Sequence, residues 1–229
     1  MKNARRIAGI VFSFVFLVRA LTLSPSAEIK VYRSVATDKK QIALTFDDGP
    51  HPTLTPRILE ILAKYNVTAT FFMVGQNVFN YPEAARAVIE AGHEVGNHTF
   101  THPHIANLNE KAIFDEIGRC EDALEELCEY RPHILRTPQG AMTPSLEKCL
   151  LEDDYILVLW SLDTRDWENK STAHIVRTVL DRVQPGDIIL MHDYIGHNSK
   201  TPEALEKIIP ILLSQGYEFV TVSALLGIG

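Results

Sequence analysis

The sequence predicts an α/β fold in one domain, with parallel strands that close into a barrel. Three observations support this prediction. Roughly 200 residues remain after an apolar N-terminal leader, which is the size of one α/β domain. Within them, short β-rich runs alternate with segments of helical pattern, and no linker or repeat interrupts the alternation. Polar clusters follow the predicted strands, as functional groups do in parallel α/β folds.

The first 27 residues have the pattern of an export signal. Basic residues open the chain, an apolar run occupies positions 7–18, and small residues follow at 23–27. The apolar run is too short to span a bilayer and suits a signal peptide. We expect residues 1–27 to be a signal peptide cleaved near Ser26 or Ala27, or else an uncleaved N-terminal anchor; a buried structural helix is the alternative. In either exported form, the protein would be secreted or held at the cell envelope.

The rest of the chain, residues 28–229, is expected to be a single domain. Its β-rich runs predict strands at 42–46, 70–74, 94–97, 133–136, 155–160, 187–191 and 218–222. The segments between them predict helices at 56–65, 82–91, 110–129, 144–152, 172–182 and 202–214. Three helices are preceded by a threonine and have a proline in the first turn, which predicts N-caps at Thr55, Thr143 and Thr201. This alternation gives a parallel barrel or a doubly wound sheet.

Charge and composition limit the class of partner. The net charge is −7, and the leader contributes four cations and no carboxylate, so the domain without it stands near −11. This charge argues against a nucleic acid partner, and the remaining Lys and Arg residues form no basic run. A neutral or cationic substrate fits better. Membrane contact is expected only through an uncleaved leader, and the oligomeric state is left open.

The three cysteines do not suggest a disulfide framework, because their number is odd and the chain is long enough to bury a core. Cys120 and Cys128 lie on one predicted helix, about 12 Å apart, which is too far for a disulfide. A bridge between Cys128 and Cys149 is the alternative. We expect buried thiols that pack as small apolar side chains.

Five polar clusters end the predicted strands or directly follow them. They occupy residues 45–49, 98–102, 136–140, 163–167 and 190–192. Five clusters on one rim favour a closed barrel, since an open sheet would spread them along a line. Together they hold an oxygen ligand, two imidazoles, a spare carboxylate and a histidine able to act as an acid. This is the equipment of a mononuclear metal hydrolase.

Asp47 and Asp48 stand where the strand 42–46 ends. Neighbours within a strand point to opposite faces, so both carboxylates reach one site only if the strand has ended, and Gly49 and Pro50 supply that break. Two close carboxylates repel, which raises one pKa unless a cation neutralises them. A metal ion on one of them would remove this penalty. Taken alone, Asp-Gly-Pro is also common turn chemistry.

His98 and His102 have the spacing of a metal-ligand pair. On a helical turn, residues four apart would present two imidazoles on one face. A polar loop with solvated histidines is the alternative. With Asp48, the pair predicts a site for one divalent ion held by two histidines and one carboxylate. Zn²⁺ is the default ion, and Co²⁺, Mn²⁺, Fe²⁺ or Ni²⁺ would also suit these ligands.

In order and content, the five clusters resemble the successive motifs of the polysaccharide deacetylases, the NodB-homology group of carbohydrate esterase family 4. The matching segments read TFDDGPH, HTFTH, RTPQG, DTRDW and PGDIILMH, and the resemblance covers about residues 29–226. It implies a distorted (β/α)₇ barrel as the catalytic domain. It also implies metal-dependent hydrolysis that removes N-acetyl groups from N-acetylglucosamine in a polysaccharide, either peptidoglycan or chitin-like oligomers. An O-acetyl esterase acting on xylan and a silent carbohydrate-binding relative are the alternatives.

The resemblance also implies a role for each matching residue. Asp47 would be the general base, oriented by Arg136, and water bound to the metal would be the nucleophile. His192 would be the general acid, partnered by Asp166. The implied metal ligands are the three residues already predicted: Asp48, His98 and His102.

The remaining implied residues shape the substrate pocket. Trp167 and Leu190 would line the space for the acetyl methyl group, and the main-chain N–H of Gln139 would stabilise the oxyanion. Glutamine stands here where the family usually has tyrosine. A main-chain donor is insensitive to this exchange, but the groove loses an aromatic stacking surface.

Overall fold

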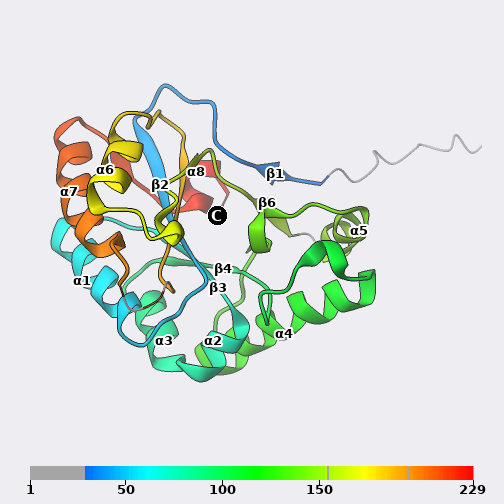
Figure 1. The fold of residues 1–229 in the computed structure, drawn as a ribbon. Helices are drawn as coiled ribbons and strands as arrows, with labels where there is room; N and C mark the ends of the chain where they lie inside the picture. The colour runs from blue at the N-terminus through cyan, green and yellow to red at the C-terminus, as the bar shows by residue number, and fades with distance from the viewer. Residues whose placement is uncertain (1–28, 154, 195, 197, 229) are drawn as a thin grey trace, which may run out of the picture.

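The computed structural model describes residues 29–228 except 154, 195 and 197, so the leader predicted at 1–27 lies outside the described residues. The named strands are all parallel and form one curled sheet surrounded by helices (Figure 1). This confirms the predicted α/β class. The strands are β1 (Val31–Tyr32), β2 (Gln41–Asp47), β3 (Thr70–Met73), β4 (Glu94–Asn97), β5 (Ile134–Leu135), β6 (Ile156–Val158), β7 (Leu162–Asp163), β8 (Ile188–His192) and β9 (Glu218–Phe219).

Most helices match their predicted positions. They are α1 (Leu54–Tyr65), α2 (Gly75–Asn80), α3 (Pro82–Glu90), α4 (Glu110–Cys128), α5 (Pro144–Asp153), α6 (Thr172–Leu180), α7 (Thr201–Ser214) and α8 (Val222–Leu226). Three short 3₁₀ turns add η1 (Ile105–Asn107), η2 (Pro138–Gly140) and η3 (Asp166–Glu168). β1, α2, β7 and α8 were not predicted, because elements of two to six residues are too short to show a periodicity.

Two short strands that are close in the chain, β6 and β7, lie near opposite ends of the sheet. The order along the sheet is β1-β6-β5-β4-β3-β2-β8-β7, so β6 and β7 lie near opposite ends of the hydrogen-bonded path. Only residues 159–161 separate them in the chain. This short link requires the sheet to curl, and β6 and β7 are not hydrogen-bonded to each other, so the curled sheet has a break between them. The predicted strand 155–160 corresponds to β6 alone, and the curled sheet is the distorted barrel that the resemblance implies.

Alternation along β2 positions the site. Ile42, Leu44 and Phe46 belong to the main hydrophobic core, whereas Ala43 belongs to a separate cluster with residues of β3, β5, β6, β8 and α8. Successive strand residues point to opposite faces, so Asp47 shares the face of Ala43. The carboxylate therefore enters the barrel interior where the parallel strands end.

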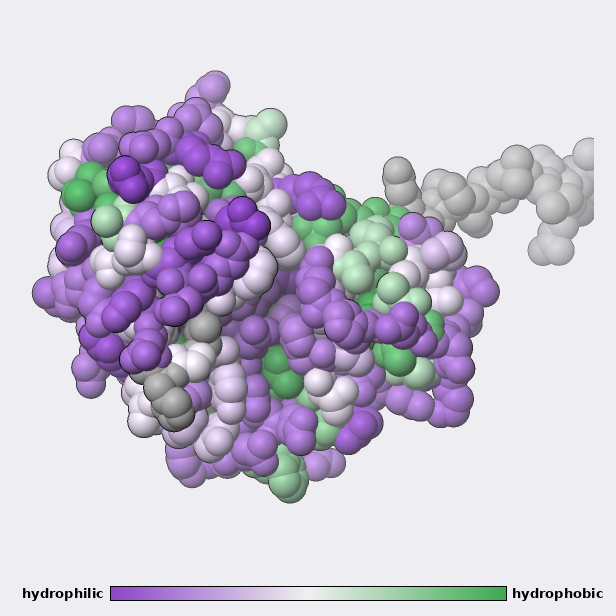
Figure 2. Space-filling view, viewed as in Figure 1, coloured by the Kyte–Doolittle hydropathy of each residue, from purple (hydrophilic) through white to green (hydrophobic). Residues whose placement is uncertain are grey.

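Two further predictions concern the surface and the cysteines. No described helix is both long and apolar enough to cross a bilayer. The face in Figure 2 is mainly hydrophilic, with apolar side chains gathered over the β1, β6 and α5 region. Cys120, Cys128 and Cys149 are all buried, and no disulfide joins them in the described part of the chain. The prediction of buried thiols is confirmed.

Candidate functional site

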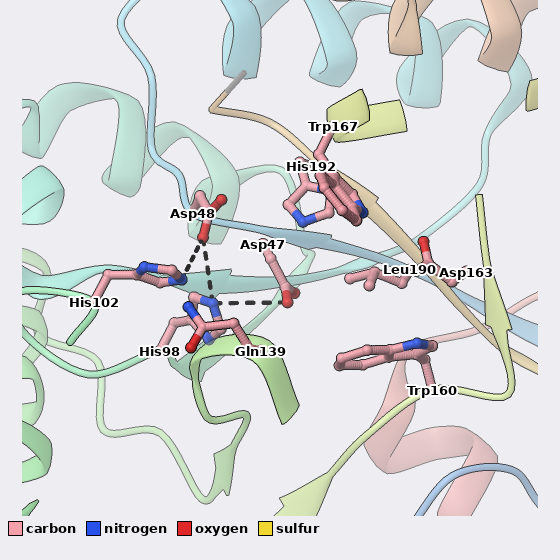
Figure 3. Close-up of a pocket in the computed structure, with 10 residues that line it drawn as sticks. All are labelled: Asp47, Asp48, His98, His102, Gln139, Trp160, Asp163, Trp167, Leu190 and His192. Atoms are coloured by element: carbon pink, nitrogen blue, oxygen red, sulfur yellow. Dashed lines mark ion pairs between the residues drawn. The ribbon is translucent and has the colours of Figure 1, made fainter. Parts of the chain in front are cut away.

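The carboxyl ends of the strands surround a pocket of about 330 Å³ (Figure 3). All five polar clusters contribute to it or to its direct supports. Its ten lining residues are Asp47, Asp48, His98, His102, Gln139, Trp160, Asp163, Trp167, Leu190 and His192. The two other predicted site residues, Arg136 and Asp166, lie behind this lining, where Arg136 contacts Asp47 and Asp166 contacts His192.

Arg136 holds Asp47 from inside the barrel. The arginine is fully buried, and its Nη1 lies 2.7 Å from Asp47 Oδ1 and 2.7 Å from Thr45 Oγ1. Its other donors reach the main-chain oxygens of Val158 at 3.1 Å and Leu159 at 3.0 Å. Burial lowers the pKa of Arg136, and the charge of Asp47 opposes that shift. Asp47 Oδ1 is thus fixed, while Oδ2 is left to face the pocket.

Asp48 turns away from the strand toward two imidazoles. Its φ of 76° is left-handed, and its Oδ1 lies 3.3 Å from His98 Nε2 and 3.2 Å from His102 Nε2. His98 Nδ1 lies 2.6 Å from the oxygen of Arg136, which assigns the ring proton to Nδ1 and leaves the Nε2 lone pair free. Asp48 Oδ1 is buried without a hydrogen-bond partner. Three electron-pair donors within 4.8 Å of one another, with an orphaned carboxylate oxygen, fit a cation.

Charge coupling within this trio is strong. Burial raises the pKa of Asp48, but the adjacent His98 imidazole and the charges of His192 and His102 lower it to about 2. Burial lowers the pKa of His98, and the charges of Asp47 and Asp48 outweigh this effect and raise it. Without a cation, a proton on His98 would stabilise the carboxylates. Metal binding must displace that proton, so metal affinity should weaken in acid.

The two histidines do not lie on a helical turn, and this part of the prediction is wrong. His98 directly follows β4 and enters a loop in which Thr99 and His102 have φ values of 65° and 56°. Glu116 of α4 accepts hydrogen bonds from the main-chain N–H groups of Phe100 and Thr101. The loop is therefore folded against α4, and this long-range contact brings both imidazoles to Asp48.

His192 and Asp166 form a second cluster across the pocket. His192 Nδ1 lies 2.8 Å from Asp166 Oδ1, and the His192 main-chain N–H donates to Oδ2 at 2.9 Å. Thr201 Oγ1 also donates to Oδ2, at 2.7 Å. Burial disfavours the charged imidazole, but the hydrogen bond and charge of Asp166, with the charges of Asp47 and Asp48, raise the pKa of His192 to about 9. His192 is therefore a charged acid at neutral pH.

Two of the three predicted N-cap threonines donate to buried carboxylates instead. Thr143 caps α5 by accepting from the N–H of Leu146. Thr201 lies inside the first turn of α7 and donates to Asp166, while Thr55 lies inside the first turn of α1 and donates to Asp193. Pro56 and Pro202 do lie in the first turn, but α1 starts at Leu54 and α7 at Thr201, so each threonine is already inside its helix. The caps at Thr55 and Thr201 were wrong predictions.

The pocket wall carries both predicted and missed residues. Leu190 is nearly buried and Trp167 is half exposed, and both line the pocket as predicted. Gln139 has a φ of 55°, and its main-chain N–H has no hydrogen-bond acceptor in the described chain. Trp160 was missed, although its place at the end of a predicted strand was a usable signal. A side chain at Gly140 would place its Cβ 2.9 Å from the Trp160 ring.

Comparisons with known proteins agree with this geometry. The family model described as polysaccharide deacetylase matches residues 34–156. A peptidoglycan-N-acetylglucosamine deacetylase of Bacillus cereus is 41% identical over 194 residues, which cover 84% of this chain and 91% of that protein. Other relatives are named peptidoglycan-N-acetylmuramic acid deacetylase and chitooligosaccharide deacetylase.

Solved structures show the same relationship. The crystal structure of the Bc1960 peptidoglycan N-acetylglucosamine deacetylase superposes with a TM-score of 0.84 at 37% identity and covers 87% of this chain and 94% of that one. A family 4 acetyl xylan esterase from Clostridium thermocellum, solved with a cobalt ion, gives a TM-score of 0.77 at 36% identity, with 82% and 93% covered. The family model, the relatives and the shared fold agree with the five motifs, and the chain belongs to the polysaccharide deacetylase family of hydrolases.

Proposed function

We propose that this chain is an exported, metal-dependent N-deacetylase that removes acetyl groups from N-acetylglucosamine in a polysaccharide, with peptidoglycan as the first candidate. One observation carries the proposal: a single pocket opposes the Asp48, His98 and His102 cluster to the charged acid His192, with Asp47 between them. The names of the Bacillus cereus relative and of the Bc1960 structure favour peptidoglycan over other polymers.

The metal would be held by the three pocket residues whose lone pairs converge. A divalent ion there, with Zn²⁺ as the default, would polarise the acetyl carbonyl and lower the pKa of water. Asp47 then acts as the base. Arg136 fixes Asp47 Oδ1, so Oδ2 is the oxygen that receives the proton of the attacking water.

His192 supplies the proton that the leaving amine needs. Amines leave poorly unless protonated, and the pKa of His192, raised to about 9, keeps the imidazole charged at neutral pH. Asp166 holds the ring through Nδ1, so the proton on Nε2 is the one available for transfer. The unpaired main-chain N–H of Gln139 is the donor that we assign to the developing oxyanion.

The apolar wall suits an acetylated sugar. Leu190 and Trp167 bound the space that we assign to the acetyl methyl, and Trp160 adds an aromatic surface for the sugar ring. The half-exposed Trp167 leaves the pocket open to a polymer rather than enclosing a monomer.

An O-acetyl esterase is the second candidate, because an acetyl xylan esterase shares the fold at 36% identity. Ester and amide hydrolysis need the same base and oxyanion donors, so the pocket itself does not discriminate between them. A silent relative is disfavoured, because the base, the acid and all three ligand residues are present in one pocket.

Acetate release tests the proposal directly. The substrates are N-acetylglucosamine oligomers, peptidoglycan and acetylated xylan, and the chain is stripped of metal and then given Zn²⁺ or Co²⁺. We expect metal-dependent release from an N-acetylated polymer, abolished in Asp47→Asn. Release from xylan alone would move the assignment to the esterase. A folded protein that binds the polymer but releases no acetate with any metal would overturn both.

Export rests on the leader at 1–27 and is a separate proposal. We expect the chain, expressed with its leader, to be found outside the cytoplasm. N-terminal sequencing of the exported protein distinguishes the cleaved form from the anchored one. Recovery of the intact chain only from the cytoplasm would contradict export.

A further inference from the structure

Asp193 is a buried carboxylate that the mechanism above does not use. It follows His192 at the end of β8 and is 1% exposed. Its Oδ2 accepts a hydrogen bond of 2.5 Å from Thr55 Oγ1. Its Oδ1 is buried without a partner. Burial, with the nearby charges of Asp48 and Asp47, raises the pKa of Asp193 to about 7.

The carboxylate of Asp193 packs directly under the turn that carries Asp48. A Cβ at Gly49 would lie 2.1 to 2.4 Å from the Asp193 carboxyl atoms, so only glycine admits this contact. The main-chain N–H of Gly49 faces the same carboxylate. Thr55, which donates to Asp193, accepts in turn from the N–H of His51. Asp193 is therefore connected to both sides of the turn at 48–51.

The other side of the turn is held by α2 and its entry. Asn77 Nδ2 donates to the main-chain oxygen of Asp48 at 2.7 Å, and the N–H of Val74 donates to the oxygen of Gly49 at 2.8 Å. Asp48 has a left-handed φ, which a non-glycine residue keeps only when its surroundings fix it. The turn at 48–51 therefore contacts Asp193 on one side and accepts a hydrogen bond from Asn77 on the other.

We propose that Asp193 is a positioning residue that holds the 48–51 turn so that Asp48 faces His98 and His102. The inference rests on the metal ligands assigned above. The pocket has a similar construction on both sides: Thr201 of α7 donates to Asp166, which accepts from His192, and Thr55 of α1 donates to Asp193, which packs against Gly49, the neighbour of Asp48.

Asp187 is the matched control. It is also buried, precedes β8 as Asp193 follows it, and accepts hydrogen bonds of 2.7 Å from Ser161 Oγ and from the N–H of Gln184. It stands at the opposite end of β8 from the pocket. A purely structural role for Asp193 predicts that Asp193→Ala and Asp187→Ala act alike.

The experiment measures Zn²⁺ affinity of the metal-stripped full chain by chelator competition, with the Co²⁺ absorption spectrum as a readout of ligand geometry. Thermal unfolding of each metal-free variant is recorded beside it. We expect Asp193→Ala to weaken Zn²⁺ binding by about 10- to 100-fold, as loss of partners behind ligands does, and to change the Co²⁺ spectrum. Asp187→Ala should lower the melting temperature and leave both metal readouts unchanged.

Thr55 provides a second route that removes no charge. Thr55→Val should weaken Zn²⁺ binding in the same direction as Asp193→Ala, and Thr55→Ser should bind as the wild type does. This pair decides the question if Asp193→Ala does not fold. Wild-type affinity in folded Asp193→Ala, or in Thr55→Val, would overturn the inference, as would an equal loss in Asp187→Ala. A wild-type chain that binds neither metal would instead refute the ligand assignment itself.

Discussion

The pocket has an acid half, formed by His192 and Asp166, and a metal half, formed by Asp48, His98 and His102. The two halves differ in how well their carboxylates are hydrogen-bonded. Around His192, Asp166 accepts from the His192 ring and main chain and from Thr201, so both carboxylate oxygens are used. Around Asp48, two imidazole nitrogens face a buried carboxylate oxygen that has no partner. A satisfied network rigidifies its members, whereas an unsatisfied buried oxygen is costly. The carboxylate of Asp166 is satisfied within the protein, whereas Asp48 Oδ1 is left for the cation that we propose.

Arg136 and Asp47 join the halves. The Arg136 side chain holds Asp47, and its main-chain oxygen holds the ring of His98. The charges of Asp47 and Asp48 also help to raise the pKa of His192. We therefore expect substitutions around Asp48 to weaken metal binding and substitutions around His192 to leave it unchanged. Both kinds of substitution should lower kcat/KM.

We expect the largest effect from a substitution that removes a metal ligand. Asp48→Ala removes the one anionic ligand, so we expect Zn²⁺ binding to be lost and kcat/KM for acetate release to fall by about 10³-fold or more. Chelator competition and acetate assays measure the two effects. The hydrogen bonds of Asp166 to His192 and Thr201 should remain, so the metal-free variant should still unfold cooperatively, although loss of the Asp48 charge should lower the pKa of His192. Undiminished Zn²⁺ affinity would mean that the ion lies elsewhere.

We expect the next largest effect from a substitution that removes the carboxylate partner of His192. Asp166→Asn should lower kcat/KM by about 10²-fold, because the histidine loses the charge that keeps it protonated. Zn²⁺ affinity should stay within about threefold of the wild type, since no Zn²⁺ ligand is altered. The alkaline limb of the pH profile should move to lower pH. An equal loss of metal affinity would show that the two halves are not independent.

A smaller effect concerns stability in the absence of metal. The folded-state pKa of His192 is raised from 6.5 to about 9, so its stabilising contribution is complete below pH 6.5 and is lost as the pH rises through 9. The contribution of His192 to the unfolding free energy of the metal-free wild type should fall by at most about 3 kcal/mol over this range. Urea unfolding at pH 6, 7.5 and 9 measures it. Asp166→Asn should show a flatter dependence, and an identical slope would contradict the assignment.

The smallest effect probes the wall between the halves. Trp167 is half exposed, so Trp167→Ala should raise KM for the polymer by only a few-fold and leave kcat and Zn²⁺ affinity nearly unchanged. Phe79→Ala is the control, because Phe79 is also an exposed aromatic side chain but does not line the pocket. Equal changes in both variants would remove Trp167 from the binding surface.

The sequence predicted the site better than it predicted the local structure. Asp48, His98 and His102 were identified from residue type and spacing, and they do converge. The helical turn assigned to the histidines was wrong, because Glu116, fourteen residues beyond His102 on α4, determines the loop. Residue type and spacing indicate which side chains can bind a metal. They do not indicate which distant residue determines the conformation of the loop that carries those side chains.

The residues that the sequence analysis missed share one property. Trp160 and Asp193 belong to none of the five polar clusters, and their place at the site becomes visible only through contacts with residues far away in the chain. Thr55 and Asp193 lie 138 residues apart in the chain. From the neighbouring sequence, Thr55 could be predicted only as a helix N-cap. No local pattern indicates that its hydroxyl donates to a buried carboxylate from another part of the chain.

The sequence alone predicted the alternation of strands and helices, the rim on which the polar clusters lie and the residues that gather in the pocket. These follow from local periodicity and from the chemistry of the side chains. Only the tertiary structure decided how the sheet curls between β6 and β7, how His102 reaches Asp48 and which buried carboxylates support the site. Those features depend on hydrogen bonds between segments far apart in the chain, which form only once the packed core has fixed their distances.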